Sequence, residues 1–127
     1  MSNLAASPAA YRQSTVLSAT PAQLVVLLYD GARRFLRQAA LAMREGQVER
    51  AHNTLRRAEL IIGHLDVILD HDQGQLAAQL HAIYEFLLRH LNEARLHQDP
   101  AKVEEVGELL GELREAWAQV AAEDPRA

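Results

Sequence analysis

The amino-acid sequence predicts an all-α protein that folds as an antiparallel, up-down-up-down four-helix bundle with a short N-terminal arm. Three observations lead to this class. Alanine and leucine dominate the chain, and aromatic residues make up only 5% of it. No segment alternates apolar and polar residues with the period of two that half-buried strands show. The four prolines, Pro8, Pro21, Pro100 and Pro125, all fall outside the expected helix interiors, where proline would break the backbone hydrogen bonding.

The first helix is expected to begin after Thr20 and to stop at Gly46. Thr20 is a good N-cap, Pro21 suits the first helical position, and Gln23 stands three residues after the cap, as in a capping box. Gly46 is a typical stop because glycine adopts the left-handed backbone conformation without steric cost.

The three later helices are expected over residues 47–70, 75–97 and 100–122. Residues 71–74, His-Asp-Gln-Gly, form a turn, and Asp99-Pro100 repeats the cap-plus-proline start. At 1.5 Å per residue each helix is about 35 Å long. Helices of similar length joined by short loops pack as antiparallel neighbours in a bundle.

The chain is expected to divide into three parts. Residues 1–19, rich in alanine and serine, form a flexible N-terminal arm. Residues 20–122 form the four-helix bundle, and residues 123–127 form a disordered tail. A chain of 127 residues is long enough for one domain with a single core.

Composition excludes several classes of protein. A net charge of −4 and a pI of about 5.8 argue against nucleic acid as a partner. The chain has no cysteine, so it forms neither disulfides nor thiolate metal sites. The longest apolar run, residues 24–29, is far shorter than the roughly 20 residues that span a bilayer, and the N-terminus lacks the features of a signal peptide. We therefore expect a cytoplasmic protein without membrane insertion.

Apolar residues recur at three- and four-residue spacing in every helix, as at the seam of a bundle. We expect Trp117 of the fourth helix to be mostly buried; the seam of this helix comprises Val103, Val106, Leu110, Leu113, Trp117 and Val120. Gly107 and Gly111, one turn apart, leave two interpretations open: close approach of a neighbour, or helix breakers on a solvated face. The seam of the first helix comprises Leu24, Leu28, Gly31, Phe35, Ala39 and Ala42; that of the third comprises Leu76, Leu80, Ile83, Leu87, Leu91 and Ala94.

The first helix carries a second apolar stripe beside its seam. Together the two stripes cover roughly 220° of the helix surface, against the roughly 100° that a surface helix needs. A small bundle cannot bury all of this area, so a partner helix, a second copy or the arm should cover the rest. The second stripe comprises Val25, Tyr29, Ala32, Leu36, Ala40 and Met43; Ile61, Ile68, Tyr84 and Leu88 flank the seams of later helices.

The sequence contains no pattern that predicts an enzyme. A di-iron bundle needs Glu-x-x-His on two helices, whereas this chain has that spacing once, at Glu49 and His52. The six histidines are therefore interpreted as surface residues, and no metal or cofactor is expected. No phosphate-binding loop or nucleophile motif is present. The basic stripe of the first helix is interpreted as its solvated face; it comprises Arg33, Arg34, Arg37 and Arg44.

Several motifs, taken in order, resemble the flagellar secretion chaperone family, FliS, over about residues 11–120. The arm carries a Y-x-Q-x-x-V pattern at residues 11–16, and LYDGA follows at residues 28–32. AELII at residues 58–62, IYEFL at residues 83–87 and LREAW at residues 113–117 complete the match. The resemblance implies a bacterial cytoplasmic chaperone that binds the disordered C-terminal segment of flagellin, prevents premature polymerisation and aids delivery to the export gate.

The partner-binding residues are expected on the surplus apolar surface and on the arm. An amphipathic segment would lie in apolar grooves of the bundle, and the resemblance implies that the arm covers part of the same surface when flagellin is absent. A protein of the export gate is a further implied partner. The candidate residues are Tyr11, Val16, Leu17, Val25, Leu28, Tyr29, Ile61, Ile68, Tyr84 and Leu88.

Two other interpretations stay open. The wide apolar faces could pack on a second copy in a structural homodimer, although we expect a monomer or a weak dimer. A metal-dependent bundle enzyme is the other alternative. Sedimentation tests the first, and metal analysis of the purified protein tests the second.

Overall fold

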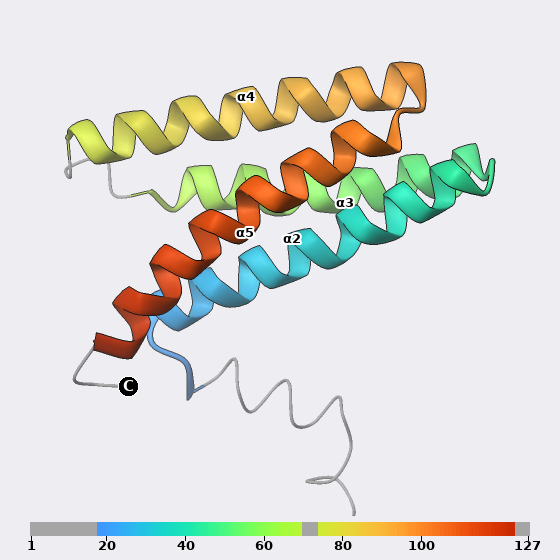
Figure 1. The fold of residues 1–127 in the computed structure, drawn as a ribbon. Helices are drawn as coiled ribbons and strands as arrows, with labels where there is room; N and C mark the ends of the chain where they lie inside the picture. The colour runs from blue at the N-terminus through green and yellow to red at the C-terminus, as the bar shows by residue number, and fades with distance from the viewer. Residues whose placement is uncertain (1–17, 70–73, 124–127) are drawn as a thin grey trace, which may run out of the picture.

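The computed structural model describes residues 18–69 and 74–123, which form four α-helices and no strand. The helices are α2 (Pro21–Arg44), α3 (Val48–Val67), α4 (Gln75–His97) and α5 (Pro100–Glu123). Successive helices run in opposite directions (Figure 1). This arrangement confirms the predicted all-α, up-down-up-down four-helix bundle.

The expected arm and tail fall largely outside the part of the chain that the structure describes. Tyr11, Val16 and Leu17 lie there, as do residues 70–73 of the turn and residues 124–127 of the tail. The proposed docking of these three arm residues on the bundle therefore stays a prediction.

Local capping signals place the start of α2 where the sequence predicts it. The Thr20 hydroxyl accepts a hydrogen bond from the Gln23 backbone N–H at 3.3 Å, and the Gln23 side chain accepts one from the Thr20 N–H at 2.9 Å. Both bonds of the capping box are thus formed, and they satisfy donors that the first turn leaves unpaired. Gly46 follows the helix with a φ of 71°, a left-handed conformation that glycine adopts readily.

The later helix ends follow the predicted signals closely. The Asp99 carboxylate accepts hydrogen bonds from the backbone N–H groups of Ala101 and Lys102, so it caps α5. The helix α4 has the predicted bounds, residues 75 and 97, whereas α3 ends at Val67, before the expected residue 70.

The helix α2 is the most closely packed helix of the bundle. It lies against both α3 and α5, while α4 contacts these two neighbours less extensively. The reason is visible in the sequence of α2, because its fully buried positions include Ala32, Ala39, Ala40 and Ala42. Small side chains allow helix axes to come closer together than leucine or phenylalanine would.

The buried face of α2 is wider than the predicted seam: Gly31, Ala39 and Ala42 are buried as predicted, but most of the second stripe is buried as well. The predicted second stripe is core, because Tyr29, Ala32 and Leu36 are fully buried, whereas Leu24 is exposed and Phe35 is half-buried. Each helix of a bundle faces two neighbours, so its buried arc is wider than that of a helix lying on one surface. Much of the apolar area that the sequence presents as surplus is therefore interior.

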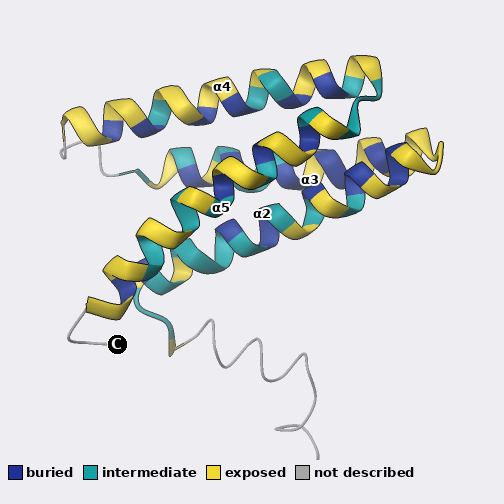
Figure 2. Ribbon diagram, in the orientation of Figure 1, coloured by how far each residue is buried: buried dark blue, intermediate teal, exposed yellow. Residues whose placement is uncertain are grey.

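The helix α4 buries four of its predicted seam residues, Leu80, Leu87, Leu91 and Ala94, but not the other two. Tyr84 is buried in α4, and the predicted seam residues Leu76 and Ile83 are exposed. In α5, Trp117 is partly buried and packs against the core. Figure 2 shows the buried positions of the helices turned toward the interior. The buried seam of α3 comprises Ala51, Leu55, Ala58, Ile62 and Leu65.

Arg33 of α2 lies against two glycines of α5. Its Nε donates a hydrogen bond to the carbonyl oxygen of Gly107 at 3.2 Å. A guanidinium nitrogen lies 3.0 Å from the position that a Cβ would take on Gly111, whereas nothing lies within 4 Å of that position on Gly107. Close approach of a neighbour, one of the two interpretations of this glycine pair, therefore applies to Gly111.

Replacing Gly107 with alanine is expected to raise the free energy of unfolding by about 0.5–1 kcal/mol, because alanine favours the helix more than glycine does. Gly111→Ala gains the same helix propensity but must displace the Arg33 guanidinium, so its net change should be close to zero. Urea denaturation of the two single variants, followed by circular dichroism, measures this difference. Equal stabilisation by both substitutions would show that the Arg33 contact contributes nothing.

Candidate partner-binding surface

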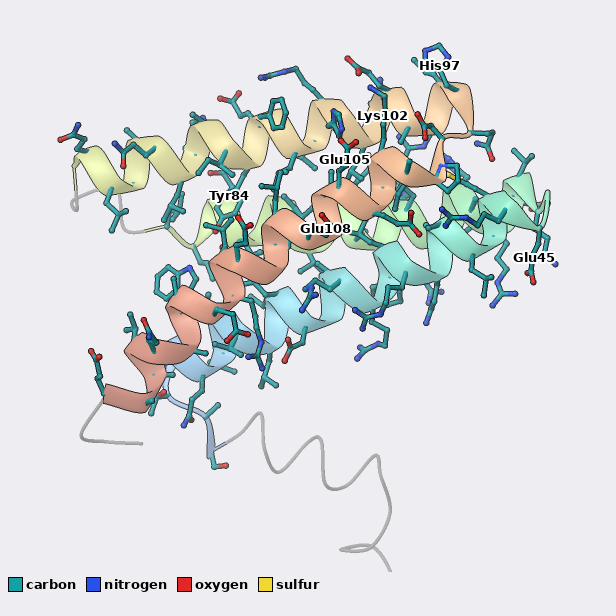
Figure 3. All side chains as sticks on the ribbon, viewed as in Figure 1. Glu45, Tyr84, His97, Lys102, Glu105 and Glu108 are labelled. Atoms are coloured by element: carbon teal, nitrogen blue, oxygen red, sulfur yellow. The ribbon has the colours of Figure 1, made fainter. Side chains whose placement is uncertain are left out.

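Two of the sequence-predicted binding residues meet in the core instead of at the surface. Tyr29 of α2 is 0% exposed and Tyr84 of α4 is 1% exposed. Their hydroxyl oxygens are hydrogen-bonded at 2.5 Å. Figure 3 shows Tyr84 pointing from α4 into the bundle. The placement of these two residues on an open groove is therefore corrected, because neither side chain lines a surface.

The tyrosine pair joins helices on opposite sides of the core. Burial raises the pKa of Tyr29, and hydrogen bonds with Tyr84 and Trp117 oppose this shift only in part. Burial also raises the pKa of Tyr84, and the hydrogen bond with Tyr29 raises it further. Both phenols therefore stay neutral far above pH 7 and serve as a polar link within an otherwise apolar core.

Three of the remaining candidates, Leu28, Ile61 and Ile68, lie along the seam where α2 and α3 meet. Ile61 Cδ1 is 3.4 Å from the position that a Cβ would take on Gly31, so the two residues face each other. Because the helices are antiparallel, two turns back along α2 correspond to two turns forward along α3. This register places Leu24 beside Ile68, which are 37% and 45% exposed.

Half-buried residues continue this apolar surface along the seam. We name the whole surface the α2/α3 face. Ile61 packs against the core from α3, and Phe35 does the same from α2. The α2/α3 face comprises Leu24, Leu28, Phe35, Ile61 and Ile68.

Two predicted residues do not belong to the α2/α3 face. Val25 is half-buried against the core, one turn before Tyr29. Leu88 is half-buried on α4, two turns after His81, whose ring contacts Asp66 of α3. Leu88 therefore borders the seam between α3 and α4, a different side of the bundle.

Sequence reasoning missed a second apolar surface between α4 and α5. His90 of α4 pairs with Glu105 of α5 at 2.9 Å, which fixes the register of these antiparallel helices. One turn away, Phe86 stacks on the His90 ring with centroids 5.5 Å apart, and Leu109 follows Glu105. Farther along, the two helices diverge toward the C-terminal end of α5 (Figure 1). The exposed apolar residues of this α4/α5 face are Leu76, Ile83, Phe86, Leu109 and Val120.

The sequence pattern predicted several residues of the α4/α5 face as buried seam positions and not as surface. Leu76, Ile83 and Val120 fit the spacing of a seam, and the stripe one position along, with Ala77 and Tyr84, fits equally well. The structure buries Ala77 and Tyr84 of this second stripe together with the seam residues Leu80, Leu87, Leu91 and Ala94. Leu76 and Ile83 are exposed because Ala77 and Tyr84, one position along the helix, turn inward instead.

Charged pairs hold α4 to both of its neighbours. On the α3 side, His81 Nδ1 lies 2.8 Å from an oxygen of Asp66, and Arg95 pairs with Glu59. On the α5 side, Lys102 pairs with Glu93 at 3.1 Å. The hydrogen bond with Asp66 raises the pKa of His81, and the charges of Asp66 and Glu85 add to this effect. The His81 contact is therefore strongest in mildly acidic solution, where the ring is protonated.

The Glu49–His52 spacing does not build a metal site in the structure. Both side chains are exposed, and His52 Nδ1 accepts a hydrogen bond from Arg95. Within residues 18–69 and 74–123, no three histidine, aspartate or glutamate side chains lie close enough to share a metal ion. Among the helices described, none has the length and apolar character needed to cross a membrane.

These features define a helical bundle whose apolar side faces suit a protein partner. The whole-chain comparisons make the family explicit, since the model of the flagellar protein FliS family matches residues 3–124. The chain belongs to the FliS family, as the motifs of residues 11–117 suggest.

Curated relatives support this assignment over most of the chain. The flagellar secretion chaperone FliS of Salmonella typhimurium is 37% identical over 110 residues, which cover 85% of this chain and 82% of that protein. Its counterpart from Bacillus subtilis is 34% identical over 110 residues, covering 87% and 82%. The relative from Campylobacter jejuni is 30% identical over 112 residues, covering 87% and 88%. FliS is a family of flagellar export chaperones and not of enzymes.

Proposed function

We propose that this chain is a flagellar export chaperone that binds the disordered C-terminal segment of flagellin in the bacterial cytosol. Binding would prevent premature polymerisation and aid delivery of flagellin to the export gate. The observation that carries the proposal is the α2/α3 face, where Leu24 and Ile68 stand exposed beside half-buried Leu28, Phe35 and Ile61. An amphipathic segment needs such a row to receive its apolar side chains.

The distribution of apolar surface fits a partner that folds as it binds. A disordered segment must offset the entropy of its own ordering, so the buried area should be on the order of 1,000–3,000 Å². The α2/α3 face and the α4/α5 face lie along different helix pairs, so a partner that wraps the bundle can use both.

Titration calorimetry and circular dichroism with the C-terminal segment of flagellin from the same genome test the proposal. We expect a negative heat-capacity change, because apolar surface is buried. We also expect more helicity than the sum of the separate components. A peptide of the same composition in scrambled order is the control. Absence of both heat and helicity gain at about ten micromolar, where complexes of ordinary affinity form, would refute the chaperone assignment.

The same samples address the other proposed interactions. Sedimentation of the chain alone and with peptide separates a monomer or weak dimer from an obligate homodimer, whose apolar faces would be occupied by a second copy. An export-gate protein is proposed as the second partner from family membership alone. Its binding should survive saturation of the α2/α3 face by peptide if it uses another side of the bundle.

A further inference from the structure

Two arginines lie beside the α2/α3 face, and their charge is not needed to bind an apolar partner side chain. The guanidinium groups of Arg34 and Arg57 lie 5.8 Å and 5.7 Å from the centre of the Phe35 ring. Both side chains are exposed, and no carboxylate of the described residues pairs with either. By contrast, Arg44 and Arg114 each form an ion pair with an acidic residue of a neighbouring helix.

The two guanidinium groups occupy the half of the α2/α3 face around Phe35, and an Arg34 nitrogen reaches to within 3.9 Å of the position that a Cβ would take on Gly31. Leu24 and Ile68 mark the opposite, apolar end, and the contact between Gly31 and Ile61 lies between the two ends. From Leu24 to Phe35 the helix α2 advances about 16 Å, or three turns. The face therefore has room for a short helix with one row of apolar side chains and cationic groups at one end.

The surface beyond Phe35 continues this polar character. A shallow hollow there is lined by Arg50, Asn53, Thr54 and Arg57, with Glu49 as its acidic residue. The Thr54 hydroxyl donates back to the Arg50 carbonyl oxygen at 2.9 Å. Arg50, Asn53 and Arg57 line this hollow, and Arg50 also donates a hydrogen bond to the Gln47 side chain at 3.4 Å.

The positive charge of these arginines favours the C-terminal end of a partner helix over its N-terminal end. The last turn of a helix has unpaired carbonyl oxygens and a partial negative charge, and a free chain end adds a carboxylate. Arginine binds carboxylate through two parallel hydrogen bonds. Contact with the Phe35 ring orders both guanidinium groups before the partner arrives, which lowers the entropy that binding costs.

We propose that the α2/α3 face holds the final helical turns of the partner, with the terminal carboxylate between Arg34 and Arg57. The partner helix then runs in the same direction as α2 and antiparallel to α3. Its apolar side chains lie over Leu24, Leu28 and Ile68. This inference rests on the proposed function, in which the partner contributes its C-terminal segment.

The test uses two synthetic peptides of the flagellin C-terminal segment, one with a free carboxylate and one with a C-terminal amide. Amidation should weaken binding to the full chain about three- to tenfold, as expected for loss of a partly exposed ion pair and helix-end charge. In the double variant Arg34→Gln/Arg57→Gln, amidation should change the affinity less than about twofold, because the guanidinium groups that bind the carboxylate are absent. Calorimetry gives all four dissociation constants.

A matched control removes two other exposed arginines. Arg56→Gln/Arg89→Gln changes the net charge by the same amount, but these residues lie on the outer surfaces of α3 and α4, away from Phe35. The amide effect should persist in this variant. Circular dichroism of both variants checks that the bundle is folded, and the comparison of the two peptides on the unaltered chain needs no variant.

The outcomes separate this inference from the proposed function. Equal binding of both peptides to the unaltered chain would overturn the carboxylate inference and leave the chaperone function standing. An amide effect of the same size in Arg34→Gln/Arg57→Gln would also overturn it, since the carboxylate would then lie elsewhere. Binding of neither peptide to any of these proteins would refute the proposed function itself.

Discussion

Truncation of Tyr29 to alanine is expected to lower the free energy of unfolding by about 3–5 kcal/mol, the range for removing a buried aromatic ring from a core. Tyr29 is fully buried at the point where α2 faces α4. Truncating its side chain therefore leaves a cavity inside the core. The substitution also leaves the Tyr84 hydroxyl without its partner. Urea denaturation followed by circular dichroism measures the loss.

Phenylalanine substitutions separate the hydroxyl pair from the rings. Tyr29→Phe keeps the ring but leaves the Tyr84 hydroxyl buried without this partner, which should cost about 1–3 kcal/mol. Tyr29→Phe/Tyr84→Phe removes both hydroxyls, so its cost should be clearly smaller than the sum of the two single variants.

Additive single-variant costs would contradict the hydrogen-bonded pair. Phe86→Ala is the control for ring removal at an exposed position, and its cost should stay below about 1 kcal/mol. A loss at Phe86 as large as that at Tyr29 would mean that the buried face of α4 is assigned to the wrong side.

The helices could be predicted from the sequence because their ends depend on local chemistry. The Thr20 capping box, the Asp99 cap and the Gly46 stop each act within a few residues. Such contacts form in the same way whatever the rest of the chain does. The start of α2 was therefore predicted to the residue. The bounds of α4 also match the prediction, because the turn residue Gly74 precedes it and the cap of α5 follows it. The antiparallel topology followed from the short connections.

The choice of buried stripe could not be made from the same pattern. On α2, the stripe through Leu28 and Phe35 and the stripe through Tyr29 and Leu36 have identical spacing and lie close together on the helix surface. Which one turns inward depends on packing against α3 and α5, and on the partner that Tyr29 finds in Tyr84. That information lies in contacts between residues far apart in the sequence.

The candidate site, like the fold, was predictable only where local sequence pattern decides the outcome. Ile61, Ile68 and Tyr84 were all predicted to bind a partner because they flank a seam; Ile61 is half-buried and Ile68 exposed, whereas Tyr84 is buried. Arg34 and Arg57 were not predicted, because an exposed arginine of an amphipathic helix carries no signal of its own. Only the register of α2 against α3 brings both to the Phe35 ring.

Replacing Leu24 and Ile68 together with aspartate is expected to weaken binding of the flagellin C-terminal segment by about 2–4 kcal/mol. This corresponds to roughly a 30- to 1,000-fold rise in Kd. Covering a partly exposed leucine or isoleucine contributes about 1–2 kcal/mol, and a carboxylate in the groove must also lose water. Because both side chains are substantially exposed in the free bundle, its fold should be retained.

Leu60→Asp/Val67→Asp is the matched control for this double substitution. These residues are 63% and 76% exposed, and Val67 is the sequence neighbour of Ile68, but both point away from the seam with α2. Introducing two carboxylates at these positions changes the net charge equally, yet peptide affinity should change less than about threefold. Calorimetry of both variants therefore distinguishes loss of apolar contact on one face from a general effect of added charge. Equal weakening by the two pairs would contradict the placement of the partner along the α2/α3 face, because only one pair lies on it.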